Sequence, residues 1–200
     1  MVTRSLKKKV LEHIESTLGK ISAVASGQDE EGNDLPFDLA MVPDCPAEGA
    51  TTIVTVGLSD TEVAQSSGGK IRQEFVFCAY QRYGTEWFSE FMKVMGYVCD
   101  AILKDGQAVA SGDVFDLGSP IAPGSRVSAL YFSDPLYHIE DFWKLETAKG
   151  EVFFGWMLPI TGDEMAFLAE KGPDDLDRAF NEQEPDLMDL ARESVAFLKH

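Results

Sequence analysis

The sequence predicts an α+β fold in a single domain over residues 1–200: a mixed, mainly antiparallel sheet packed by helices, with C-terminal helices after it. Three observations support this class. Helix and strand signals follow one another irregularly, and the last of them are helical. No Pro-rich or Gly/Ser-rich linker separates two halves that could each form a core. No repeat of fixed period is present, which argues against solenoids and propellers.

The N-terminal part predicts one helix followed by extended or irregular chain. Apolar residues recur at helical spacing from Leu6 to Leu18, and Gly19 is suited to end that helix. The stretch 27–32 is polar and bounded by glycines, which predicts a loop. Three prolines then favour extended or irregular chain over helix: Pro36, Pro43 and Pro46.

Two strands and the clearest helix are predicted next. Residues 51–56 are mostly β-branched and stop at a glycine-containing turn. Residues 71–79 alternate between an apolar face and a second face that becomes less polar toward its end, so the two strands could form a hairpin with a long loop. After Thr85, aromatic and aliphatic residues recur every three or four positions until Lys104, as expected for a helix packed on a sheet.

Glycines and prolines from 112 to 125 predict a structured loop, and residues 126–132 predict a strand that stops before Pro135. Residues 152–160 are apolar, rich in large side chains and too few for a buried helix. They therefore predict a strand covered on both faces.

A capping box follows that strand directly. Thr161 and Glu164 have the spacing at which each side chain satisfies a backbone N–H near the other. Three short helices are expected to begin near Asp163, Asp174 and Pro185.

The composition is that of an acidic globular protein, with 44% hydrophobic residues and a formal net charge of −17. This charge argues against nucleic acid as a direct partner, because phosphate backbones are bound by clustered Lys and Arg. No apolar run approaches the roughly 20 residues that span a bilayer, and the start does not resemble a signal peptide, so a cytoplasmic location is expected. An odd number of cysteines indicates packed or free thiols: Cys45, Cys78 and Cys99.

Acidic side chains are concentrated in two regions. Residues 21–69 contain nine acidic and no basic residues, and residues 161–200 contain eleven acidic and four basic ones. Such regions could attract a cationic protein, although a solvated surface that maintains solubility is the more common explanation. If a partner does bind through charge, the candidate surface consists of Asp29, Glu30, Glu31, Asp34, Asp174 and Asp175.

Searches for catalytic and cofactor motifs give little. Ser59 follows a strand as a hydrolase nucleophile would, but the glycine expected two places later is Thr61, and His138 is the only base far from the chain ends. A serine-type hydrolase using Ser59 and His138 is thus the unfavoured enzymatic alternative. The cysteines and histidines lack metal-ligand spacing, and no phosphate or dinucleotide fingerprint is present, so no metal and no cofactor is expected.

Two further interpretations remain. Aromatic residues could line a small-molecule pocket, for which Trp87, Tyr131 and Trp156 are the candidates, although such residues are usually core. The adjacent carboxylates Asp163-Glu164 and Asp174-Asp175 stand at expected helix starts, where the helix dipole and free N–H groups explain them without acid–base chemistry.

Taken in order, several stretches of this chain resemble the suppressor-of-fused domain family in its short bacterial form. The resemblance covers almost the whole chain, and Trp156–Met165 is its strongest marker. The other stretches are Leu11–Gly19, Thr55–Asp60, Arg72–Phe77, the Trp87–Leu103 helix, and Ser119–Ser125 leading into Leu130–Pro135.

This resemblance implies a non-enzymatic α+β domain that works by binding protein. Animal members hold a transcription-factor peptide between this domain and a second one, and this chain is expected to end where the first domain ends. Bacterial members often act as immunity proteins that neutralise a toxin. The resemblance therefore implies either an immunity protein against a basic toxin or an interaction scaffold, with an oligomeric state that the sequence leaves open.

Overall fold

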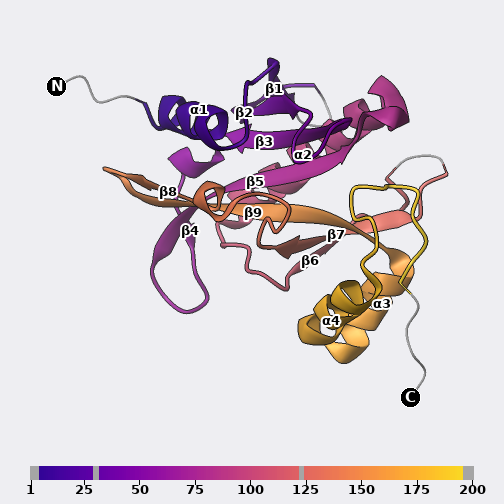
Figure 1. Ribbon diagram of the computed structural model, residues 1–200. Coiled ribbons are helices and arrows are strands. Elements are labelled where there is room, and N and C mark those ends of the chain that lie inside the picture. Colours follow the sequence, from indigo (N-terminus) through magenta and orange to yellow (C-terminus); the bar gives the residue numbers. More distant parts are fainter. Residues whose placement is uncertain (1–4, 29–31, 122–123, 196–200) are drawn as a thin grey trace.

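The computed structural model describes residues 5–28, 32–121 and 124–195, and for residues 85–87 it describes the backbone alone. Within these residues the chain forms one mixed sheet of nine strands and four α-helices, which confirms the predicted α+β class (Figure 1). The strands are β1 (Ala23–Gln28), β2 (Asp34–Pro43), β3 (Ala50–Val56), β4 (Val63–Ala64), β5 (Lys70–Tyr80), β6 (Val114–Asp116), β7 (Val127–Ser133), β8 (Lys144–Thr147) and β9 (Gly150–Thr161). The helices are α1 (Leu6–Thr17), α2 (Gly84–Asp105), α3 (Gly162–Lys171) and α4 (Pro173–Gln183).

Strands β5 and β9 are the most connected strands of the described sheet, and each pairs with three others. The strand order is β1-β2-β3-β5-β9-β7-β6, with β4 added to β5 and β8 added to β9. One edge of β9 pairs in parallel with β5, while its other edge pairs with β8 at the start of the strand and with β7 toward its end. All other pairings between the described strands are antiparallel, including β3 with β5, which confirms the predicted pairing of these two segments.

Helices cover both faces of the sheet. On one face, α1 and the two C-terminal helices share a hydrophobic cluster with Trp156, Leu158 and Ile160 of β9. On the other face, α2 packs Phe91 and Met95 into a second cluster. Figure 1 shows α1 near one end of the sheet and α3 with α4 near the opposite end.

The second half of β9 is buried on both faces, as predicted for the whole strand. From Trp156 to Thr161 every residue is buried, so both faces are covered there. In the first half the strand alternates, and Phe153 is 37% exposed because this part pairs with the short strand β8 near the edge of the fold.

Most predicted elements are confirmed, but two predicted loops contain strands. Gly27 and Gln28 belong to β1, and the rest of the predicted loop includes residues 29–31, which lie outside the described ranges. The segment 112–125 contains β6. Both strands are outermost in the sheet, and each gains its hydrogen bonds from one stronger neighbour, β2 or β7. Pairing thus overrides the weak intrinsic strand propensity of β1, whereas β6 contains the strand formers Val114 and Phe115 within a segment whose glycines and prolines favour a loop.

The helix predicted near Pro185 does not form in residues 185–195. Glu184 adopts a left-handed conformation with φ 45° and ends α4. Beyond it, the side chains of Asp186 and Asp189 accept hydrogen bonds from the backbone N–H two residues later, at 3.2 and 2.9 Å. These local bonds satisfy the backbone without a helix. Leu187 and Leu190 then enter different hydrophobic clusters instead of sharing one helical face.

A buried ion pair fixes the C-terminal segment to the end of β9. Thr161 and Glu164 form the predicted capping box, with the Thr161 N–H donating to Glu164 at 2.9 Å. The Glu164 carboxylate also accepts from Arg192 Nη2 at 2.7 Å and from the Val195 N–H at 3.0 Å. Both charged side chains are almost fully buried, so each depends on the other for charge compensation.

No helix within the described ranges is long and apolar enough to cross a membrane.

Replacing Arg192 with methionine is expected to lower the free energy of unfolding by about 3–5 kcal/mol, because the Glu164 carboxylate would remain buried without a cation. Urea denaturation monitored by circular dichroism measures this change. The double variant Glu164→Gln with Arg192→Met should recover part of the loss.

The matched control is Arg126→Met, which removes the exposed ion pair with Glu193 and should change stability little. Equal stability of the Arg192 and Arg126 variants would show that the buried pair does not anchor this segment.

Candidate binding site

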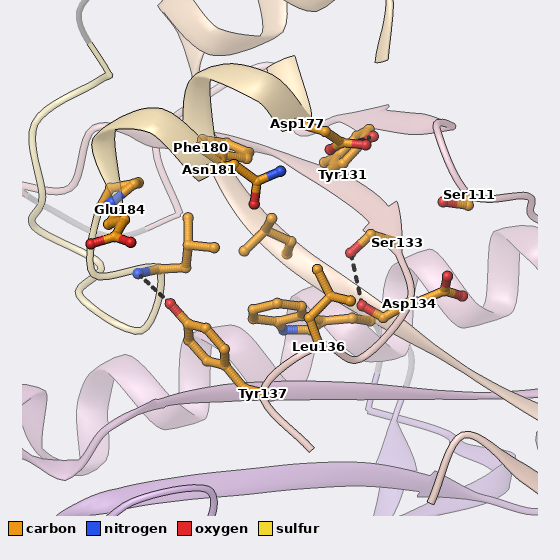
Figure 2. Close-up of a pocket in the computed structure, with 14 residues that line it drawn as sticks. Ser111, Tyr131, Ser133, Asp134, Leu136, Tyr137, Asp177, Phe180, Asn181 and Glu184 are labelled. Carbon is orange, nitrogen blue, oxygen red and sulfur yellow. Dashed lines mark hydrogen bonds between the residues drawn. The ribbon is translucent and has the colours of Figure 1, made fainter. Parts of the chain in front are cut away.

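A groove of about 480 Å³ lies between the end of β7, the middle of β9 and helix α4. The chain after β7 and the chain after α4 form its remaining walls (Figure 2). In volume it falls within the range of ligand and anchor pockets.

The floor of the groove is apolar and comes largely from the core. Trp156 and Leu158 of β9 line it together with Tyr131 of β7. The Trp156 side chain is fully buried, and its Nε1–H has no hydrogen-bond partner among the described residues. Tyr137 packs against this indole with ring centroids 4.9 Å apart. Leu136, at the edge of the groove, is 63% exposed.

The turn after β7 explains why these apolar residues stand at the surface. Pro135 cannot donate to a strand ladder, and the backbone turns there, with Leu136 N donating to Asp134 O at 2.8 Å and His138 N to Pro135 O at 2.9 Å. The turn directs Leu136 and Tyr137 to the groove, as Figure 2 shows.

The rim of the groove is acidic. Asp134 follows β7, Asp177 lies on α4, and Glu184 ends that helix, whereas no Lys, Arg or His is among the lining residues. The Tyr131 hydroxyl donates to Asp177 Oδ1 at 3.1 Å. Burial raises the pKa of Asp177, and the negative charge of Asp174 adds to this effect.

The acidic residues that the sequence suggested as a partner surface are spread over the fold. Asp29, Glu30 and Glu31 lie outside the described residues. Asp34 begins β2, next to the outermost strand β1 and far along the sheet from α4. Asp174 and Asp175 occupy the first turn of α4, as predicted for a helix start, and Asp175 pairs with Arg178 at 2.8 Å.

Among the described residues of this set, Asp174 is the one whose charge acts on the Tyr131–Asp177 pair at the groove. Sequence reasoning missed Asp134, Asp177 and Glu184. A signal for two of them was present, because Asp177 and Asn181 are spaced to share one face of α4, and Glu184 follows at helical spacing where the helix ends.

Ser59 and His138 do not form a catalytic pair. Ser59 Oγ donates to Glu74 Oε1 at 2.6 Å, while His138 Nε2 lies 3.1 Å from Thr52 Oγ1. Thr52 lies near the start of β3, and Ser59 lies in the turn after its end. The part of β3 that separates them, from Thr52 to Val56, is about 13 Å long. The hydrolase alternative is therefore wrong, because it required Ser59 and His138 to lie within hydrogen-bond reach of each other.

The Ser59 turn has a structural explanation instead. The Glu74 carboxyl is fully buried and accepts hydrogen bonds from Thr55 Oγ1 and from the N–H groups of Gly57 and Ser59 as well as from Ser59 Oγ. These bonds close the turn after β3. Burial raises the pKa of Glu74 to about 7, although the hydrogen bonds oppose this rise.

The candidate small-molecule aromatics are mainly core residues. Tyr131 and Trp156 are buried, and they meet the groove only at its floor. The side chain of Trp87 lies outside the described part of the structure. Within the described ranges, no group of three or more His, Cys, Asp or Glu side chains is placed to hold a metal ion.

Comparisons with known proteins agree with this architecture. The family model described as suppressor of fused protein matches residues 33–193. A Bacillus subtilis protein named immunity protein YqcF is 25% identical over 168 residues, which cover 83% of this chain and 85% of that protein.

Two solved structures resemble the fold. A suppressor of fused homologue from Neisseria gonorrhoeae superposes with a TM-score of 0.68 at 19% identity and covers 97% of this chain and 98% of its own. A chain in the crystal structure of the Sufu–Fu complex superposes with a TM-score of 0.67 at 14% identity, covering 95% of this chain and 92% of that one.

Replacing Glu74 with glutamine is expected to remove a pH-dependent loss of stability. The folded-state pKa of about 7 lies above the ordinary value of 4.5, so only the unfolded state loses this proton between these two pH values. The stability of the parent protein therefore falls as pH rises through this window, by up to about 3 kcal/mol relative to Glu74→Gln. Urea denaturation at several pH values measures the difference.

His138 provides the opposite control. Burial lowers its pKa from 6.5 to about 4, so its contribution to stability is lost as pH falls through that range, and His138→Gln should remove this loss. Parallel stability curves for Glu74→Gln and the parent protein would contradict a proton held by Glu74.

Proposed function

This chain belongs to the suppressor of fused family, and on that premise we propose that it is a non-enzymatic protein-binding domain of the immunity type, which binds and neutralises a basic protein toxin. The proposal extends to this chain the role carried in the name of its Bacillus subtilis relative.

The observation that carries the proposal is the groove beside α4. Protein–protein hot spots combine a buried aromatic or aliphatic anchor site with surrounding contacts that exclude water. Here Leu136 and Tyr137 are partly exposed apolar residues above a floor that contains Trp156. The rim carries carboxylates without a compensating cation among the lining residues. A partner with a basic surface and a protruding side chain would match both features.

Net charge supports a basic partner in particular. The formal charge of −17 creates a negative potential around the protein, and opposite charges accelerate diffusional encounter. We propose that Asp29, Glu30, Glu31, Asp34, Asp174 and Asp175 contribute to this attraction, while the groove supplies the short-range contacts.

The decisive experiment measures binding to basic proteins encoded beside this gene. Leu136→Lys should weaken the complex at least about tenfold, because it removes an apolar contact and places a cation where the basic partner would bind. The matched control is Val24→Lys on β1, which is also an exposed apolar residue but lies at the other side of the sheet and should bind nearly as the parent does. Calorimetry gives the affinities, and survival of cells that express the toxin tests neutralisation.

Failure of every neighbour-encoded protein to bind would contradict the immunity role. Equal affinities of the Leu136 and Val24 variants would contradict the groove as the contact surface.

A further inference from the structure

We propose that the groove beside α4 recognises an arginine of a protein partner, with the guanidinium held by the rim carboxylates and the aliphatic stem packed on Leu136 above the floor that contains Trp156. This inference rests on the proposed function, because it names the group through which a basic partner would be anchored.

The floor and edge of the groove offer an apolar surface to the stem of a long side chain. Trp156 and Leu158 lie at the floor, and the exposed Leu136 stands at the edge. The indole N–H of Trp156 is itself fully buried, so its resonance reports on an occupant through the change in its surroundings and not through a direct bond. A side chain that covers this apolar surface before its polar head reaches the rim would fit the groove.

The rim of the groove carries negative charge that no described cation compensates. Asp134, Asp177 and Glu184 reach the groove from three places in the chain, and none of them forms an ion pair with the described residues. Asp177 is already partly withdrawn from water, where its carboxylate accepts from Tyr131. A cation that enters the groove would form charge-assisted hydrogen bonds with carboxylates that have no cation nearby.

An arginine side chain fits this groove better than other side chains do. A purely apolar side chain would cover the acidic rim without pairing it, which is unfavourable. A long cationic side chain can place its aliphatic stem on Leu136 while its head reaches the rim. The planar guanidinium also stacks on aromatic faces and donates to two carboxylates at once, whereas an ammonium group acts as a compact point charge. The volume of about 480 Å³ accommodates such a side chain with its peptide unit.

Nuclear magnetic resonance of the indole N–H tests this directly. The probes are N-acetyl-arginine-N-methylamide and, as the neutral comparison, N-acetyl-leucine-N-methylamide. The arginine probe should shift the Trp156 Nε1–H signal and saturate in the millimolar range, and the leucine probe should bind about tenfold more weakly or less. Trp143→Phe and Trp87→Phe variants assign the three indole signals.

Charge neutralisation locates the contact. Asp177→Asn should weaken binding of the arginine probe about tenfold. Asp134→Asn tests the same rim without altering the hydrogen bond to Tyr131, so it is informative even if Asp177→Asn disturbs the fold. Glu182→Gln is the matched control, since Glu182 is exposed on α4 but does not line the groove.

The proposal is overturned if the arginine probe leaves the Trp156 signal unchanged up to about 20 mM, where a millimolar anchor would be visible. It is also overturned if the leucine probe binds equally well, or if both rim variants bind the arginine probe as the parent does. These outcomes are distinct from failure of the immunity role. A neighbour-encoded toxin that binds through Leu136 while the arginine probe does not bind would refute this inference alone. Arginine binding without any toxin partner would refute the immunity role alone.

Discussion

The structure depends on the placement of strand β9 in the interior of the sheet. β9 has hydrogen-bonded neighbours on both edges, and from Trp156 onward it is buried on both faces. A strand in this position can neither slip by one residue nor turn over, because either change would exchange the two hydrophobic clusters that its side chains join. Its parallel pairing with β5 also requires the long connection through α2, β6, β7 and β8, in which α2 covers one face of the sheet.

The end of β9 also positions the C-terminal region. The capping box starts α3 directly after the strand, and the buried Glu164–Arg192 pair brings residues 192–195 back to the same point. Helix α4 is thereby held over Trp156 and Leu158, and the groove exists because α4 and the turn after β7 approach β9 from two sides without filling the space between them. The groove is thus built on rigid core elements, which would favour a preorganised contact with the proposed partner.

Much of this fold follows from local sequence signals. Helix α2, the capping box and the strands β3, β5, β7 and β9 carry strong periodicity or spacing, and each formed as predicted. Strand β1 could not be recognised from its sequence. Its six residues are mostly small or polar, and they form a strand only through pairing with β2. The expected helix near Pro185 failed because two aspartate turns satisfied its backbone locally. The groove could not be predicted, since Asp134, Trp156 and Asp177 are brought together only by tertiary structure.

We propose that this domain acts through the groove that β9 supports. Hydrogen–deuterium exchange of the protein, alone and bound to a protein encoded beside its gene, tests this role. The amides of residues 133–139 and 176–185 should become protected on binding, while β1 and β2 exchange as in the free protein. Protection confined to the β1–β2 side of the sheet, with the groove segments unchanged, would contradict it.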